Sequence, residues 1–265
     1  MIQPEALLQQ YFGHKAFRTG QKQAIDAILS GRDVLAVMPT GAGKSVCYQI
    51  SALLLPGVTI VISPLISLMK DQVEALRQVG IPAAYINSSI SQEEFYHSMQ
   101  MLQQGQCRIL YVAPERLMTE SLLRLAQRVQ ISMIAVDEAH CVSQWGQDFR
   151  QSYLDIPVFM EQLLVRPVCT AFTATATKQV EADIARILKL RDPETIHTGF
   201  DRKNLFFGVR RPNSKMTELF HLLKENDGKS GIVYCSTRKA VEEVCASLCA
   251  VSYTHLRAHE TCADL

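Results

Sequence analysis

The chain has 265 residues and a formal net charge of +1, with 48% hydrophobic and 20% charged residues. This composition is typical of a soluble globular protein, and the near-neutral charge means that any contact with nucleic acid must use a local basic patch. No apolar run approaches the roughly 18 residues of a membrane span, and residues 1–5 lack the regions of a secretory signal, so we expect a cytoplasmic protein (bacterial cytosol or nucleoid) without a membrane partner.

Short apolar strands alternate with helical segments from residue 34 to residue 188. The predicted strands are Val34–Val37, Val58–Ile62, Ala83–Ile86, Ile109–Val112, Met133–Val136 and Val168–Phe172. The predicted helices are Ser45–Leu55, Ser67–Val79, Ser91–Gln104, Ser121–Val129, Ile156–Leu164 and Thr177–Leu188. The strands are β-branched and almost continuously apolar, which is typical of parallel strands covered on both faces. The order predicts an α/β fold, a doubly wound parallel sheet with functional loops at the carboxyl ends of its strands.

The first predicted strand leads into Met38-Pro39-Thr40-Gly41-Ala42-Gly43-Lys44-Ser45, and a helix follows. A glycine-rich turn between strand and helix grips a nucleoside triphosphate, because its backbone N–H groups face the phosphates. The loop residues expected to bind ATP in this way are Thr40, Gly41 and Gly43. Lys44 can reach the β- and γ-phosphates, and the Ser45 hydroxyl can bind Mg²⁺. The P-loop pattern has Gly where this chain has Met38, so a glycine-rich turn with a chance Lys-Ser pair is the alternative.

An apolar strand ends further on in Asp137-Glu138-Ala139-His140. A carboxylate at a strand end beside a P-loop can hold Mg²⁺ directly or through water, and this is the role predicted for Asp137. Glu138 is placed to orient or deprotonate a water that attacks the γ-phosphate, and His140 of the same run is a further catalytic candidate. An isolated pair of acids is more often a solvated strand end, but the P-loop upstream favours the metal site.

Two stretches are suited to nucleic acid. Lys70 lies near the start of a predicted helix and can reach a DNA phosphate, unless this is an ordinary amphipathic helix start. The run Cys141–Arg150 contains the only tryptophan of the chain. Trp145 and Phe149 offer faces on which bases can stack, and Arg150 can pair with a phosphate. A buried tryptophan that anchors the loop is the alternative.

A second unit is predicted to begin after Gly199. Leu205–Val209 and Gly231–Cys235 are predicted strands, and Lys215–Glu225 and Ser236–Leu248 are predicted helices. These residues are only enough for the opening of a second α/β domain. The sequence after residue 250 resembles a peptide obtained when sequencing-adapter DNA is translated, so we expect residues 251–265 to be a non-native tail.

Together these motifs resemble the RecQ family of superfamily 2 DNA helicases. The resemblance runs from about residue 8 to about residue 248. Its most specific stretches are Phe17–Gln21, Met38–Gln49, Ser63–Gln72, Ala113–Leu117, Asp137–Arg150 and Thr173–Ala176. The family usually has His at position 147 and Pro at position 51, where this chain has Gln147 and Ser51, and any role of that imidazole is therefore in doubt.

The resemblance implies several further features. Arg18 and Gln21 would help to hold the adenine base, since a side-chain amide can donate and accept hydrogen bonds at once. Thr173-Ala174-Thr175 would link hydrolysis to unwinding, although simple capping of a strand end is the alternative. Residues 1–200 would form a first RecA-like ATP-binding domain and residues 201–250 an incomplete second one. The family's later arginine fingers and zinc module are not found in this sequence.

The resemblance implies an ATP-dependent DNA helicase that moves 3′ to 5′, with ATP and Mg²⁺ as cofactors and single-stranded DNA or duplex junctions as partners. Two alternatives stay open. A superfamily 2 RNA helicase is compatible with the Asp-Glu-Ala-His motif, although the loop around Trp145 favours DNA. The chain as written is also compatible with a truncated ATP- and DNA-binding module that has no useful enzyme activity, because the arginines of a complete second domain stabilise the transferred phosphoryl group.

Overall fold

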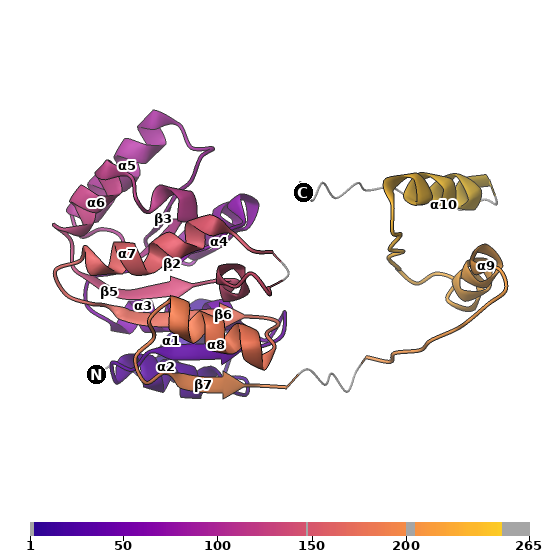
Figure 1. The fold of residues 1–265 in the computed structure, drawn as a ribbon, viewed down its shortest axis with the longest axis horizontal. Coiled ribbons are helices and arrows are strands. Elements are labelled where there is room, and N and C mark those ends of the chain that lie inside the picture. The colour runs from indigo at the N-terminus through magenta and orange to yellow at the C-terminus, as the bar shows by residue number, and fades with distance from the viewer. Residues whose placement is uncertain (1–2, 147, 200–204, 251–265) are drawn as a thin grey trace. The chain divides into compact units, whose positions relative to one another are not determined.

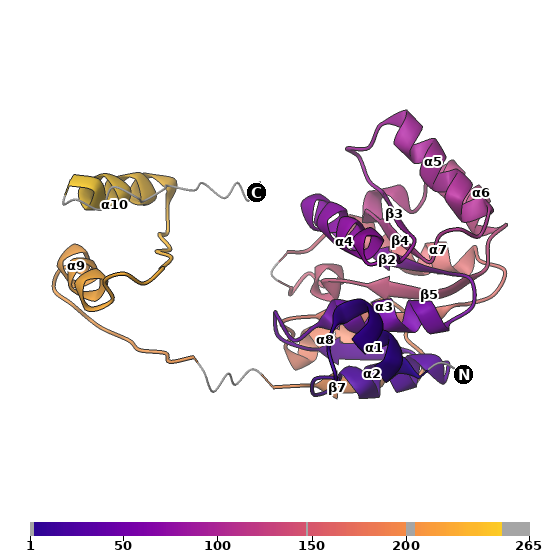
Figure 2. The same ribbon diagram turned by 180° about the vertical axis from the view of Figure 1, so that it is seen from behind.

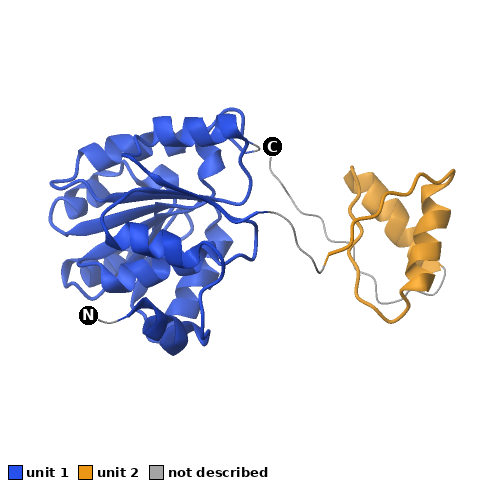
Figure 3. Ribbon diagram, turned by 90° about the horizontal axis from the view of Figure 1, so that it is seen from below, with its two compact units in different colours: residues 1–201 blue, residues 202–265 orange. Residues whose placement is uncertain are grey.

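The computed structural model describes residues 3–146, 148–199 and 205–250. The chain divides into two compact units, Met1–Asp201 and Arg202–Leu265, which Figure 3 shows in different colours. Three features of the sequence lie outside the described residues: the substitution at Gln147, the first residues of the predicted second domain (201–204) and the predicted tail at residues 251–265. None of the described helices combines the length and the hydropathy that crossing a membrane demands.

The first unit is built on a seven-stranded sheet with the strand order β3-β4-β2-β5-β6-β1-β7 (Figure 1). The strands are β1 (Val34–Val37), β2 (Val58–Ile62), β3 (Ala83–Ile86), β4 (Ile109–Val112), β5 (Ile131–Val136), β6 (Val168–Thr173) and β7 (Glu194–His197). Every pairing between them is parallel. The predicted doubly wound α/β sheet is confirmed, and the six predicted strands lie within two residues of the observed bounds.

Helices cover both faces of this sheet, and Figures 1 and 2 show the two sides. One face packs against α1 (Pro4–Phe12), α2 (Gln21–Leu29), α3 (Lys44–Leu54) and α4 (Ile66–Gln78). The other face packs against α5 (Gln92–Gln103), α6 (Glu120–Ala126), α7 (Asp155–Glu161) and α8 (Lys178–Ile187). Short 3₁₀ turns lie at η1 (Pro114–Arg116), η2 (Ala139–Val142) and η3 (Gln151–Leu154). The central strands are buried from end to end because apolar side chains meet a helix layer on either side.

Hydrogen bonds of the parallel ladder continue past the strand ends and align the residues that follow. The Met38 N–H donates to the Thr173 carbonyl at 2.9 Å, and the Asp137 N–H donates to the Ile62 carbonyl at 2.8 Å. The Ser63 N–H similarly donates to a carbonyl of β4 at 3.2 Å. The loops that carry the sequence motifs therefore lie along one carboxyl edge of the sheet, as expected for this fold class.

Apart from the short 3₁₀ turns, three elements of the first unit are not among the sequence predictions. β7 is an edge strand in which only Ile196 is buried, so it lacks the continuous apolar run that marks the other strands. Helices α1 and α2 precede the P-loop and present buried apolar residues, such as Leu8 and Ile25, toward the sheet. Each of these segments is only half-buried and mixes polar with apolar residues, so its sequence lacks the pattern that would have predicted it.

In the second unit, the prediction of strands at Leu205–Val209 and Gly231–Cys235 is wrong, because both segments lack strand structure. The predicted helices are confirmed as α9 (Lys215–Glu225) and α10 (Arg238–Ala250). A strand requires a neighbour for its backbone N–H and C=O groups, and the sheet contains no strand from residues 205–250. Apolar character alone therefore does not make these segments strands.

Candidate functional site

The P-loop residues connect the buried strand β1 to helix α3. Gly41 and Gly43 have φ values of 81° and 82°, a left-handed conformation that glycine adopts without steric penalty. Gly43 lies at the N-cap of α3, so the first N–H groups of the helix open toward the loop. The Lys44 ammonium donates to the Met38 carbonyl at 3.2 Å and thus folds back over the loop. The N–H groups at the start of α3 and the neighbouring Lys44 ammonium together form a site suited to an anion.

Gln21 supports the loop from helix α2. Its Nε2 donates to the Ala42 and Gly43 carbonyls, both at 3.1 Å, and its Oε1 accepts from the Arg18 backbone N–H at 2.8 Å. A Cβ on Gly43 would lie 2.3 Å from this Nε2, so glycine is needed there for space as well as for conformation. The Arg18 guanidinium also donates to the Gly41 carbonyl. Both residues therefore reach the loop, while their contact with adenine stays a prediction.

Asp137 lies just beyond β5 and is almost entirely buried. Burial, reinforced by the neighbouring Glu138 charge, raises the pKa of Asp137 from 3.8 to about 6, against opposing effects of the Glu138 N–H and the Lys44 ammonium. The Glu138 N–H donates to the Asp137 Oδ1 at 3.0 Å. A buried carboxylate with so little compensation is suited to a cation, because a bound metal would stabilise its charged form.

Glu138 and His140 converge on the end of β6. The His140 Nδ1 lies 3.0 Å from the Thr173 Oγ1 and 3.4 Å from the Glu138 Oε2. The Thr173 hydroxyl donates to the Thr175 carbonyl at 3.0 Å, so its oxygen is left to accept from His140. This pattern favours the tautomer that carries a proton on Nδ1. The contact between His140 and Thr173 thus joins the acid turn to the carboxyl end of β6.

The loop at Cys141–Arg150 presents its aromatic residues to solvent. Trp145 is 71% exposed and Phe149 is 38% exposed, so the alternative of a buried tryptophan anchor is wrong. Arg150 lies between two partners: its guanidinium pairs with Asp148 at 3.0 Å and donates to the Pro64 carbonyl at 3.3 Å. Exposed aromatic faces beside a cation are suited to stacking with single-stranded bases.

The base of this loop packs directly on the segment that carries the acids. A Cβ on Gly146 would lie 2.2 Å from the His140 carbonyl oxygen, so only glycine allows this approach. The Ser143 hydroxyl donates to Asp183 on α8 at 2.8 Å and accepts from the Trp145 N–H at 3.2 Å. The loop is thus fixed at its base, and only its tip is exposed.

Lys70 lies in the first turns of α4 and is exposed, with Glu74 at 3.9 Å as a weak ion-pair partner. At the end of β2, just before this helix, the buried Ser63 hydroxyl has no hydrogen-bond partner among the described residues. The N-cap residue of α4 supplies no side-chain hydrogen bond. The exposed Lys70 ammonium is accessible to a phosphate, whereas the Ser63 hydroxyl is buried, and the DNA contact of Lys70 stays a prediction.

The P-loop, the acid turn and the aromatic loop thus lie at the carboxyl edge of the sheet, whereas Gln21 reaches the P-loop from α2 and Lys70 lies on α4. Tyr153 and Ser143, which hold the acid turn and the aromatic loop, are not among the predicted residues; buried hydrogen bonds to a backbone carbonyl or a distant helix leave no periodic signal in a sequence.

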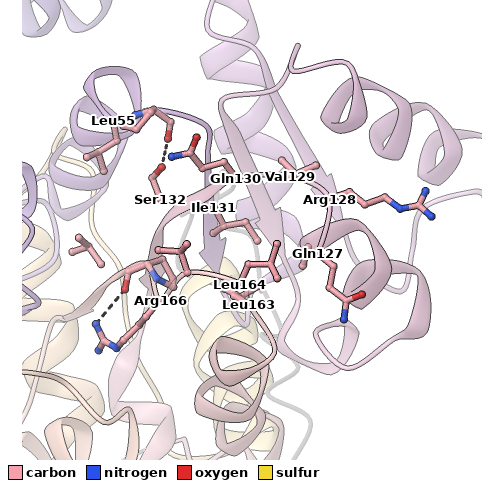
Figure 4. Close-up of a pocket in the computed structure, with 15 residues that line it drawn as sticks. Leu55, Gln127, Arg128, Val129, Gln130, Ile131, Ser132, Leu163, Leu164 and Arg166 are labelled. Atoms are coloured by element: carbon pink, nitrogen blue, oxygen red, sulfur yellow. Dashed lines mark hydrogen bonds between the residues drawn. The ribbon is translucent and has the colours of Figure 1, made fainter.

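A cavity of about 440 Å³ opens at the opposite edge, by the first residues of β5 and β6 (Figure 4). Its lining is largely apolar and includes none of the predicted site residues.

Comparison with known proteins agrees with the motifs. The family model described as "DEAD/DEAH box helicase" matches residues 18–183. Over 241 residues, covering 91% of this chain, the chain is 46% identical to the ATP-dependent DNA helicase RecQ of Bacillus subtilis (strain 168). It is 44% identical to the protein of the same name from Haemophilus influenzae over 92% of this chain. The resemblance to RecQ helicases is therefore confirmed, and the chain spans only 41% and 39% of these two relatives.

Solved structures show the same fold at lower identity. The crystal structure of the DUF1998 helicase MrfA bound to DNA superimposes with a TM-score of 0.72 at 17% identity, covering 96% of this chain and 39% of that one. The helicase domain of Hef from Pyrococcus furiosus gives a TM-score of 0.55 at 16% identity, over 97% of this chain and 56% of that one.

Proposed function

Because the chain belongs to the DEAD/DEAH box helicase family, we propose that it carries the ATP-binding part of a RecQ-type DNA helicase that moves 3′ to 5′. In the proposed reaction, ATP and water give ADP and phosphate, and hydrolysis drives strand separation in replication, recombination or repair. The observation that carries this proposal is the single sheet edge on which a P-loop, a buried acid and an exposed aromatic loop lie together. Its proposed location is the bacterial cytosol or nucleoid.

The residues at the P-loop fit a nucleotide with a bound cation. The open cradle at Gly43 and the helix N-terminus would receive the phosphates, and Lys44 would leave the Met38 carbonyl to contact them. Ser45 and Asp137 would hold Mg²⁺, which would neutralise charge that develops on the transferred phosphoryl group. Glu138 would accept a proton from the attacking water. His140 would join this acid turn to β6 through its contact with the Thr173 hydroxyl.

The aromatic loop supports a DNA partner for this site. Trp145 and Phe149 would stack on bases of a single strand, while Lys70 and Arg150 would contact phosphates. The base of the loop packs on the His140 carbonyl through Gly146. Single-stranded DNA bound to the loop would therefore shift the segment that carries the acids. DNA binding would in this way be coupled to turnover.

The second unit favours a chain with limited activity. We assign residues 201–250 to the opening of an incomplete second RecA-like domain and residues 251–265 to a non-native tail. Phe206 and Tyr234 are 94% and 90% exposed, which is typical of apolar segments without their packing neighbours. The second candidate function is therefore a module that binds ATP and DNA but turns over slowly.

Equilibrium binding tests the proposal directly. A fluorescent ATP analogue, with Mg²⁺ or with EDTA, would report the nucleotide site, and labelled single-stranded DNA and RNA of equal sequence would report the partner. We expect Mg²⁺-dependent binding of the analogue and tighter binding of DNA than of RNA. Equal or tighter binding of RNA would favour the RNA helicase alternative, and no binding of the analogue would reject the nucleotide site.

A further inference from the structure

The turn that carries the two acids has an unfavourable backbone conformation. Glu138 has φ 45° and ψ 48°, which is left-handed, and it is one of only three non-glycine residues with positive φ among those the structure describes. Such a residue keeps this conformation only when its surroundings hold it. The direction of the Glu138 side chain therefore depends on what fixes the peptide between Asp137 and Glu138.

Tyr153 fixes that peptide. Its hydroxyl donates a hydrogen bond to the Asp137 carbonyl at 3.0 Å, and its side chain is completely buried in the core below the sheet edge. The Asp137 N–H is already bonded to the Ile62 carbonyl at 2.8 Å. The peptide planes on the two sides of Asp137 are thus held by separate elements, β2 on one side and η3 on the other. Without the Tyr153 hydroxyl, the carbonyl would lose this partner, and the peptide would keep only the hydrogen bond from the Glu138 N–H to the Asp137 carboxylate.

Tyr153 also belongs to the end of the aromatic loop. The Arg150 N–H donates to the Cys141 carbonyl at 2.9 Å and closes the base of the loop, and the Tyr153 N–H donates to the Arg150 carbonyl at 3.0 Å. Arg150, whose guanidinium also donates to the Pro64 carbonyl, is therefore joined by one backbone hydrogen bond to the residue that carries this ring. The ring joins the loop that faces solvent to the peptide that directs Glu138.

We infer that Tyr153 is a positioning residue, which holds the Asp137–Glu138 peptide for catalysis and transmits the position of the aromatic loop to it through the hydrogen bond to the Asp137 carbonyl. The inference rests on the proposed function, since it concerns the same site. Tyr153 touches neither nucleotide nor water in this role; it acts on the orientation of the acids alone. Loss of the Tyr153 hydroxyl should lower the rate of metal-assisted hydrolysis and the stimulation of that rate by DNA. It should change the affinity of the P-loop for nucleotide much less.

The test compares Tyr153→Phe, which keeps the ring and removes the hydroxyl, with the control Tyr111→Phe. The Tyr111 hydroxyl is also buried, and it accepts a hydrogen bond from Gln49 at 3.0 Å, so its removal reports the general effect of losing a buried phenol bond. For the complete chain and both variants, three quantities are measured: affinity for a fluorescent ATP analogue in EDTA, affinity with Mg²⁺, and single-turnover hydrolysis with and without single-stranded DNA. A thermal melt checks folding.

For Tyr153→Phe we expect the affinity in EDTA to change by less than about twofold and the hydrolysis rate to fall by about 10- to 100-fold. The ratio of rates with and without DNA should fall toward one, while Tyr111→Phe keeps the parent ratio. A Tyr153→Phe variant with the parent's hydrolysis rate and DNA response would overturn the inference, as would equal losses in both variants. If the unmodified chain shows no Mg²⁺-dependent binding, the proposed function fails, and that result is distinct from either outcome of the variant.

Discussion

Replacing Asp137 with Asn should make the metal-free protein more stable at neutral pH, although it removes a proposed metal ligand. The carboxylate is buried, and its pKa is raised from 3.8 to about 6 by burial first and by the Glu138 charge second. Asparagine has nearly the same shape, and its side-chain oxygen can still accept the Glu138 N–H that Asp137 Oδ1 accepts at 3.0 Å. The substitution therefore removes mainly the buried charge.

The magnitude follows from proton linkage. Between pH 3.8 and about 6 the folded state binds more protons at Asp137 than the unfolded state does, so the free energy of unfolding falls as the pH rises through this window. Above the window the full penalty applies, and the difference between the two pKa values corresponds to roughly 3 kcal/mol. Allowing for the cost of burying an amide, we expect Asp137→Asn to be more stable by about 1–3 kcal/mol at pH 8 in EDTA. Below about pH 4 the charge penalty is largely lost, so the variant should then be no more stable than the parent.

Urea denaturation followed by far-ultraviolet circular dichroism measures this directly, at pH 4 and pH 8, in EDTA and with Mg²⁺. Magnesium should stabilise the parent chain at pH 8 and affect the variant much less, because binding to the folded state alone raises stability. A variant that is less stable than the parent at pH 8 in EDTA would refute the reasoning. A stability difference that does not depend on pH would refute it as well.

Four further outcomes are expected. Lys44→Ala should weaken binding of a fluorescent ATP analogue by about tenfold or more, because one charge-assisted phosphate contact is lost; unchanged affinity in a folded variant would remove the P-loop assignment. Glu138→Gln should keep that affinity but lower hydrolysis in a single-turnover assay, since an amide cannot accept the proton of water; a parent-like rate would exclude Glu138 as the base. Trp145→Ala should weaken binding of single-stranded DNA by about 1–3 kcal/mol in a fluorescence anisotropy titration and leave nucleotide affinity unchanged. Asp33→Ala should destabilise the first unit by about 3–5 kcal/mol in urea, because Asp33 is buried and its Oδ2 lies 2.6 Å from the Arg166 guanidinium, which would lose its partner; a change below about 1 kcal/mol would contradict this.

The sequence predicts the sheet well because its strands are covered on both faces. Strands such as Val58–Ile62 are apolar throughout, and that run is visible without knowledge of any neighbour. β7 at the sheet edge alternates buried and exposed residues, so the same signal is missing. In the second unit the apolar signal is present at Ile232 and Tyr234, but no sheet receives these residues, and the predicted strand does not form.

The site is predicted where chemistry requires a residue type at a fixed spacing. The glycines, Lys44 and the acid pair belong to this class, and the structure brings them to one edge. Tyr153 does not belong to it, because its role depends on a hydrogen bond from its buried hydroxyl to the Asp137 carbonyl. Nor does the sequence show that the Gln21 amide is engaged with the loop carbonyls through bonds of 3.1 Å. Such contacts depend on the packing of segments that are distant in sequence.

The measurement that tests the central claim most directly is ATP turnover by the chain, with and without single-stranded DNA, in Mg²⁺ and in EDTA. We expect slow hydrolysis that requires Mg²⁺, that single-stranded DNA accelerates, and that Lys44→Ala abolishes. Turnover that persists in EDTA or in Lys44→Ala, or that responds to RNA and not to DNA, would contradict the account.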